Sequence, residues 1–271
     1  MARKSFVFSV LVLALLAGIA YPLKMIAPQA IELSQGATID AGTIGPGQTM
    51  AVSVDPRVST GGKFGIGGVY DQLEFYSAPE GWGAKSSKIT SNPLQAEFTV
   101  APDAQEGEYT LYAHALDEGQ GEGLPTIGFK VKVHVTRDVL SVGMSPKSQT
   151  VSAGQPARFE ITINNKADTN DVYTITSQGV RGWEFKRDIF VPAMSSKTVE
   201  YEVVGYDESE YDINITAVST SSPLISQSEN LKFTVHSNLL SDLKATNNGV
   251  MIFPVMLSPL YSLAGLLANL Y

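Results

Sequence analysis

The middle of the chain is patterned as β-strands. Between residues 31 and 237, apolar and polar side chains alternate with a period of two, so successive residues would face opposite sides of a sheet. Clear examples are residues 129–135, 158–163 and 211–216. Gly, Pro, Asn, Asp and Ser interrupt these segments about every 8–12 residues, which predicts a β-sandwich. No long helical pattern occurs in this region, so we expect an all-β body.

The body also contains an internal repeat. Four segments recur in the same order, spaced by roughly one hundred residues, which indicates two homologous domains. Gly47-Gln48-Thr49 matches Gly154-Gln155-Pro156, Gly81-Trp82 matches Gly182-Trp183, Glu106–Leu111 matches Glu208–Ile213, and Phe129–Val135 matches Leu231–Val235. We therefore expect tandem sandwiches at residues 31–136 and 137–237. The first copy is longer because of a Gly-rich run at residues 60–68.

Several repeated positions have a structural explanation. Asp207-x-Ser209-x-Tyr211 fits a tyrosine corner, in which the phenol hydroxyl bonds back to the backbone a few residues upstream. The sequence around Tyr109 is a weaker version of the same pattern. Trp82 and Trp183 are large apolar side chains, and we expect them to close an end or edge of each sandwich.

Three sequence pieces resemble NEW3-type and CARDB-type immunoglobulin-like modules of prokaryotic surface proteins. They are Val151–Gln155, the pair Asn164-Asn165, and Val100–Ala104 leading to Gly107-Glu108-Tyr109. The resemblance covers both repeats and implies two tandem immunoglobulin-like β-sandwiches. Modules of this kind usually act as spacers, adhesion elements or accessory domains, and the resemblance implies such a role. Its motifs are structural turns, so it assigns no activity.

The N-terminus has the pattern of an export signal. Arg3 and Lys4 precede an uncharged apolar run from Phe6 to Ala20, and small residues precede Tyr21. Residues 1–20 are thus predicted to be a signal peptide. An uncleaved signal anchor is the alternative, although the run is short for a bilayer span.

The C-terminus predicts a membrane anchor. Residues 249–271 contain no charged side chain and are rich in Leu, which fits one transmembrane helix. Residues 238–248 form a polar juncture before it. No Lys or Arg follows the segment, so a buried assembly helix or a processed tail is an alternative. Together the ends predict a cell-membrane location with the body outside the cytoplasm.

The amino-acid composition limits the kinds of functional site that the chain can contain. The chain has no cysteine, which excludes disulfides and thiolate sites, and favours a bacterial or archaeal origin for an exported protein. Its net charge of −8 argues against nucleic-acid binding, which requires a basic surface. Acidic groups such as Asp207, Glu208 and Glu210, or Asp117 and Glu122, fall in expected turns. We therefore expect no enzyme activity and no organic cofactor.

Two weaker site predictions concern the second repeat. Asp168, Asn170 and Asp171 cluster in one loop and carry the oxygen ligands that calcium takes, although their spacing is not that of an EF-hand. Asn214-Ile215-Thr216 is an N-glycosylation sequon, and Asn214 should face solvent because Ile213 and Ile215 alternate inward.

The leading functional hypothesis is a membrane-anchored structural or interaction protein of the cell envelope. It would act as a stalk, an adhesion surface or part of a surface assembly, with another envelope protein or a second copy as partner. One alternative is a non-catalytic accessory subunit of a membrane enzyme or translocation complex. A weaker alternative is a carbohydrate-binding module, whose ring platform would come from Tyr70, Phe75 and Tyr76.

Overall fold

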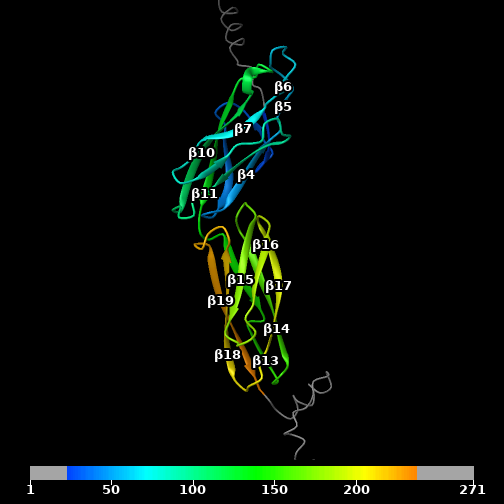
Figure 1. Ribbon diagram of the computed structural model, residues 1–271, viewed down its shortest axis with the longest axis vertical. Coiled ribbons are helices and arrows are strands. Elements are labelled where there is room, and N and C mark those ends of the chain that lie inside the picture. The colour runs from blue at the N-terminus through cyan, green and yellow to red at the C-terminus, as the bar shows by residue number, and fades with distance from the viewer. Residues whose placement is uncertain (1–22, 237–271) are drawn as a thin grey trace, which may run out of the picture. The chain divides into compact units, whose positions relative to one another are not determined.

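The computed structural model describes residues 23–236, which form two compact units (Figure 1). Among these residues, the first unit contains those up to Arg137 together with Ala167–Thr169, and the second contains those from Asp138 onward except that segment. The predicted signal segment at 1–20, the juncture at 238–248 and the helix at 249–271 lie outside the described residues. Within residues 23–236, no helix has the length and apolar character needed to cross a bilayer.

The first unit contains two facing sheets. One has the strand order β2-β1-β4-β9-β8, and the other has the order β3-β11-β10-β7. Their bounds are β1 Leu23–Ala27, β2 Glu32–Leu33, β3 Thr38–Ile44, β4 Thr49–Val54, β7 Gln72–Ser77, β8 Gly83–Lys85, β9 Leu94–Thr99, β10 Gly107–Leu116 and β11 Ile127–Val135. A short ribbon, β5 (Arg57–Val58) with β6 (Gly68–Val69), and a 3-10 turn, η1 (Glu118–Gln120), are inserted. The first strand begins at Leu23, upstream of the predicted domain start at residue 31.

The second unit has the same plan. One sheet has the order β12-β14-β17, and the other has the order β13-β19-β18-β15-β16. Their bounds are β12 Leu140–Ser145, β13 Ser148–Val151, β14 Pro156–Asn165, β15 Asp171–Gln178, β16 Lys186–Val191, β17 Ser195–Val204, β18 Glu210–Ser219 and β19 Ser226–Val235.

Strand order identifies both units as immunoglobulin-like sandwiches. In each, the first part of the chain is split between the sheets. β1 pairs antiparallel with β4 while β3 runs parallel to β11, and β12 pairs antiparallel with β14 while β13 runs parallel to β19. The units differ at one edge, because β8 joins the sheet of β9 whereas β16 joins the sheet of β15. The all-β, immunoglobulin-like prediction is therefore confirmed for the described residues.

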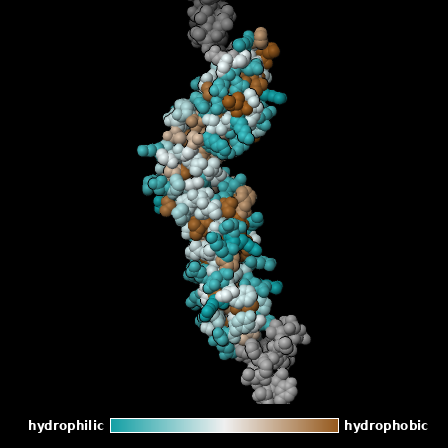
Figure 2. All heavy atoms as spheres, in the orientation of Figure 1, coloured by the Kyte–Doolittle hydropathy of each residue, from teal (hydrophilic) through white to brown (hydrophobic). Residues whose placement is uncertain are grey.

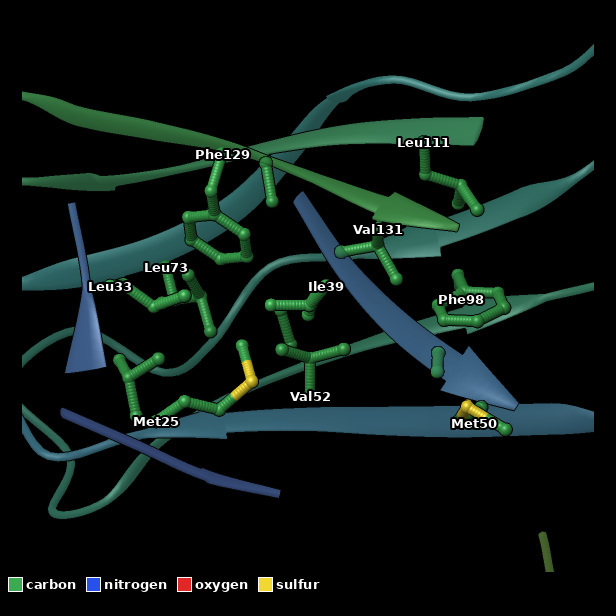
Figure 3. Packing of buried hydrophobic residues seen from close by; sticks show 14 of the residues in the cluster. Met25, Leu33, Ile39, Met50, Val52, Leu73, Phe98, Leu111, Phe129 and Val131 are labelled. Atoms are coloured by element: carbon green, nitrogen blue, oxygen red, sulfur yellow. The ribbon is translucent and has the colours of Figure 1, made fainter. Parts of the chain in front are cut away.

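Alternation along the strands builds the core. In β11, Phe129, Val131, Val133 and Val135 are buried while the lysines between them are exposed, as the sequence pattern predicts. Figure 3 shows Phe129 and Val131 pointing into the same interior as Phe98 of the opposite sheet. Burying each such side chain stabilises the fold by about 1.5–3 kcal/mol.

The repeated motifs occupy equivalent places in the two units. Gly47 and Gly154, which precede β4 and β14, have φ values of 73° and 77°, a left-handed conformation that glycine adopts without strain. Both predicted tyrosine corners are present. The Tyr109 hydroxyl donates to the Gln105 carbonyl oxygen at 3.0 Å, and the Tyr211 hydroxyl donates to the Asp207 carbonyl oxygen at 3.4 Å. The shorter bond thus belongs to the corner with the weaker sequence pattern.

Candidate functional site

A cluster of aromatic rings lies on the outer face of the β3-β11-β10-β7 sheet. It consists of Tyr76 from β7, Tyr112 and His114 from β10, and Lys130 from β11, and we call it the aromatic face. Tyr76 is 55% exposed although it is a large ring, and Lys130 is also exposed. Exposed rings that touch one another on a soluble domain are typical of a binding surface.

Strand register brings these residues together. His114 is paired with Glu74, but Tyr112 is paired with Ser77, so the register shifts by one residue and Tyr76 is the additional residue of a β-bulge. A bulge bends its strand and changes the direction of a side chain. The inward neighbours on β10, Leu111 and Ala113, are fully buried, which fixes Tyr112 and His114 on the outer side.

The rings are held in defined contacts. Tyr76 stacks on His114 with centroids 4.7 Å apart and an interplanar angle of 22°, and lies 6.0 Å from Tyr112. Lys130 Nζ is 5.8 Å from the Tyr112 ring centroid, within cation–π range. Nε2 of His114 hydrogen-bonds Oε1 of Glu74 at 2.6 Å, which fixes the imidazole plane. The platform is thus preorganised.

Charged and polar groups border the rings. On β10 and β11, the pair Thr110 and Lys132 adjoins the pair Tyr112 and Lys130. The next outward pair is Glu108 and His134, in which Nδ1 of His134 hydrogen-bonds Oε1 of Glu108 at 2.9 Å. Gly128 lies opposite His114 and contributes no side chain that would cover it. This combination of flat rings with donors and acceptors can bind a molecule that has an apolar face and several polar substituents.

The ring platform predicted from sequence is only partly right. Tyr76 is exposed, but Tyr70 is fully buried and its hydroxyl donates to the Pro125 carbonyl oxygen at 2.8 Å. Phe75 turns inward and packs edge-on against Phe98 at 5.4 Å. Proximity in sequence therefore did not predict proximity on the surface. The outward alternation of Tyr112-x-His114 was the signal that could have identified the other two rings.

The three residues of the predicted calcium loop bond to separate partners. Asp168, grouped with the first unit, accepts the backbone N–H of Thr43 at 2.6 Å. Oδ1 of Asn170 accepts the backbone N–H of Ala193 at 3.0 Å. Asp171 is buried and accepts the hydroxyls of Ser219 and Ser221, at 2.7 and 3.0 Å. Across residues 23–236, no three His, Cys, Asp or Glu side chains gather as a metal site.

Asn214 lies in the middle of β18, between the fully buried Ile213 and Ile215. Its Nδ2 donates to Oδ1 of Asn230 at 2.8 Å, and its Oδ1 accepts the Thr216 hydroxyl at 2.8 Å. The side chain is therefore on the outer side of the sheet, as the alternation predicted. Glycosylation of this sequon stays a prediction.

Asp117 has a structural role. Its Oδ2 accepts the backbone N–H groups of Glu122 and Leu124, both at 3.0 Å, and so holds the β10–β11 loop. Burial alone would raise the pKa of this carboxyl. The backbone hydrogen bonds outweigh burial and hold the pKa below its ordinary value of 3.8.

Comparisons with known proteins add little to this description. No protein-family model and no curated protein matches the chain. A chain from the complex of human zinc 2-glycoprotein with prolactin-inducible protein is 9% identical with a TM-score of 0.31, and the match covers 36% of this chain and 95% of that one. A CARDB domain from Pyrococcus furiosus, solved with di-metal ions, is 15% identical with a TM-score of 0.30, over 36% and 87% respectively. The immunoglobulin-like assignment rests on strand order.

Proposed function

We propose that this chain is a membrane-tethered, extracytoplasmic interaction protein of the cell envelope, and that the aromatic face is its binding surface. The observation that carries the proposal is the ring cluster in which the exposed Tyr76 stacks on the partly exposed His114 and contacts the partly exposed Tyr112. Two uncharged apolar segments, Phe6–Ala20 and residues 249–271, flank the described domains and support the tether. The sequence resemblance to NEW3-type and CARDB-type modules favours the same role.

A non-catalytic role is part of the proposal. Several carboxylates that sequence placed in turns are occupied by structural hydrogen bonds, as Asp117 and Asp171 illustrate. The one close His–carboxylate pair on the aromatic face, His114 with Glu74, orients a ring that is itself covered by Tyr76. These contacts favour recognition over bond-breaking chemistry.

The tether is tested by carbonate extraction and intact-mass measurement of the protein from its own membranes. We expect the protein to stay with the membrane and to retain Tyr271, whether it starts at Met1 or near Tyr21. A protein that washes off, or that lacks the residues after about Asn248, would rule out the C-terminal anchor.

The aromatic face also favours a second candidate function, the binding of a glycan. A pyranose ring presents C–H groups on its flat side, which pack on an aromatic ring such as Tyr76. Its hydroxyls need donors and acceptors around that ring, and Glu74 and Lys130 supply both. A single exposed Tyr would not favour this function, whereas rings combined with polar neighbours do.

Glycan binding is tested by titration calorimetry with defined hexasaccharides of glucose, mannose and N-acetylglucosamine. We expect Tyr76→Ala to weaken binding about tenfold, since an aromatic contact contributes about 0.5–1.5 kcal/mol beyond its buried area. Tyr206→Ala is the matched control, because Tyr206 is 67% exposed in the second unit and lies off this face. Equal binding by the two variants, or no binding by any form, would eliminate the glycan candidate and leave the tether proposal standing.

A further inference from the structure

The loop between β5 and β6 presents two large apolar side chains to solvent. Phe64 is 84% exposed and Ile66 is 81% exposed, the two highest exposures among the large apolar side chains of the described residues. We call this pair the apolar tip. Figure 2 shows hydrophobic atoms gathered at the end of the first unit where Figure 1 places β5 and β6. Apolar side chains this exposed are typical of a contact with a partner or a membrane.

The backbone of the loop is held in place. Gly67 N–H donates to the Gly61 carbonyl oxygen at 2.9 Å, and Lys63 N–H donates to the Glu122 carbonyl oxygen at 2.8 Å. Gly67 has φ +94°, and a Cβ there would overlap the carbonyl oxygen of Val58. The exposure of the apolar tip is therefore a built feature of the loop, because the fold fixes the backbone that carries it.

The chain enters the first unit at this same end. Leu23 begins β1, and the carbonyl oxygen of the next residue, Lys24, accepts the N–H of Asp55 at 2.8 Å. β5, the base of the ribbon, begins two residues later, at Arg57. Only Tyr21 and Pro22 separate Leu23 from the apolar run that ends at Ala20. Ala20 and Leu23 are three residue steps apart, at most about 11 Å, so a run held in a bilayer would keep this end of the unit at the membrane surface.

A second apolar–basic pair lies at the same end. Ile89 is 59% exposed and follows Lys88, and the N–H of the next residue, Thr90, donates to the Asp71 carbonyl oxygen at 2.8 Å. The backbone N–H of Asp71 in turn donates to the carbonyl oxygen of Leu116, the last residue of β10. Phe64 likewise follows a lysine, Lys63. Apolar side chains beside lysines suit the bilayer interface, where rings and aliphatic groups enter the acyl boundary and ammonium groups meet lipid phosphates.

We propose that the apolar tip inserts into the interface of the membrane that holds residues 6–20 as an uncleaved anchor. This inference rests on the proposed membrane tether in the form that retains residues 1–20, and adds to it a lipid contact made by the folded domain. Phe64 and Ile66 would enter the acyl boundary, and Lys63 would lie at the headgroups. The first unit would then have a fixed orientation on the bilayer, set by two points of attachment at one end.

The test uses the full chain reconstituted into vesicles of phosphatidylcholine and phosphatidylglycerol, with and without brominated acyl chains. Phe64→Trp places a reporter on the tip, and Phe190→Trp is the matched control, since Phe190 is 50% exposed in the second unit. The unmodified chain gives the background from Trp82 and Trp183. We expect brominated lipid to remove most of the emission that Phe64→Trp adds and to leave the Phe190→Trp emission unchanged.

Three results would overturn the inference. Equal, weak quenching of both variants in vesicles that still carry the protein would show that the tip is away from lipid, and the tether would stand. A concentration-dependent blue shift of the Phe64→Trp emission without lipid quenching would instead assign the tip to contact with a second copy. A chain that does not float with the vesicles would contradict the tether itself, and the inference with it.

Discussion

Replacing Asp117 tests how the β10–β11 loop is held. Asp117 is 8% exposed, and its carboxylate accepts the N–H groups of Glu122 and Leu124. Asp117→Ala removes both acceptor bonds. Each buried donor left without a partner costs about 1–3 kcal/mol. Since Leu124 is buried and Glu122 is exposed, we expect the free energy of unfolding of the first unit to fall by about 2–3 kcal/mol. Asp117→Asn keeps one acceptor oxygen and should cost about 1 kcal/mol.

The loss should depend on pH with a defined sign. The folded-state pKa of Asp117 lies below its ordinary value of 3.8, so the ionised carboxylate contributes stability above that pH. This contribution is lost as the pH falls through the folded-state pKa. The difference between the wild-type protein and Asp117→Asn should therefore be full at neutral pH and shrink below about pH 4.

Urea denaturation followed by tryptophan fluorescence measures the effect on each unit. In a Trp183→Phe background, Trp82 reports the first unit alone, and in a Trp82→Phe background Trp183 reports the second. The first transition should shift in the Asp117 variants and the second should not. A loss below about 0.5 kcal/mol for Asp117→Ala at neutral pH would refute the reasoning, since that is the range of ordinary surface substitutions. A difference that does not change with pH would refute the assigned role of the charge.

Three further predictions concern the tyrosine corners, Trp82 and the loop that carries Phe64. Tyr109→Phe should cost the first unit about 1 kcal/mol, and Tyr211→Phe should cost the second unit less, because its corner hydrogen bond is 3.4 Å rather than 3.0 Å long; equal losses would contradict this. Trp82→Ala removes the fluorescent reporter of the first unit, so its urea denaturation is followed by circular dichroism. It should cost about 2 kcal/mol, since the half-buried indole stacks on Phe98 at 6.0 Å and lies 5.1 Å from Tyr109. Gly67→Ala should change Phe64→Trp emission, because the loop must shift; unchanged emission would contradict a pinned loop.

Local rules in the sequence predicted the strands and the tyrosine corners. They did not predict which of the two sheets the edge strand joins. The alternation in β11 and the spacing around Tyr211 each act within one segment, so both could be seen without the fold. The edge strand is β8 in the first unit and β16 in the second, and the sheet that it joins depends on which neighbouring strand buries its side chains. β16 buries Ile189 and Val191 beside β15, whereas every residue of β8 is exposed. Nothing local to Gly83–Lys85 specifies its partner, so its pairing could not be predicted.

The loop predicted to hold calcium shows why neighbours in sequence need not converge. Asp171 is the first residue of β15, and its buried carboxylate is directed to Ser219. Asn170 precedes it by one residue and is exposed, and it bonds the backbone of Ala193. Successive residues at the start of a strand point to opposite sides, which separates their oxygens. A ligand set needs side chains that converge, and that depends on contacts between distant segments.

The aromatic face depends on a register that no segment specifies alone. Alternation predicts that Tyr112 and His114 face outward, but it does not predict that Tyr76 meets His114. In a regular ladder Tyr76 would lie opposite Tyr112; the one-residue shift pairs Tyr112 with Ser77 and places the Tyr76 ring 4.7 Å from the imidazole. Because Tyr76 remains 55% exposed, the stacking adds little burial and contributes little to stability. Tyr76→Ala should therefore leave the unfolding transition of the first unit nearly unchanged. Any loss of binding in that variant would then belong to the site and not to the fold.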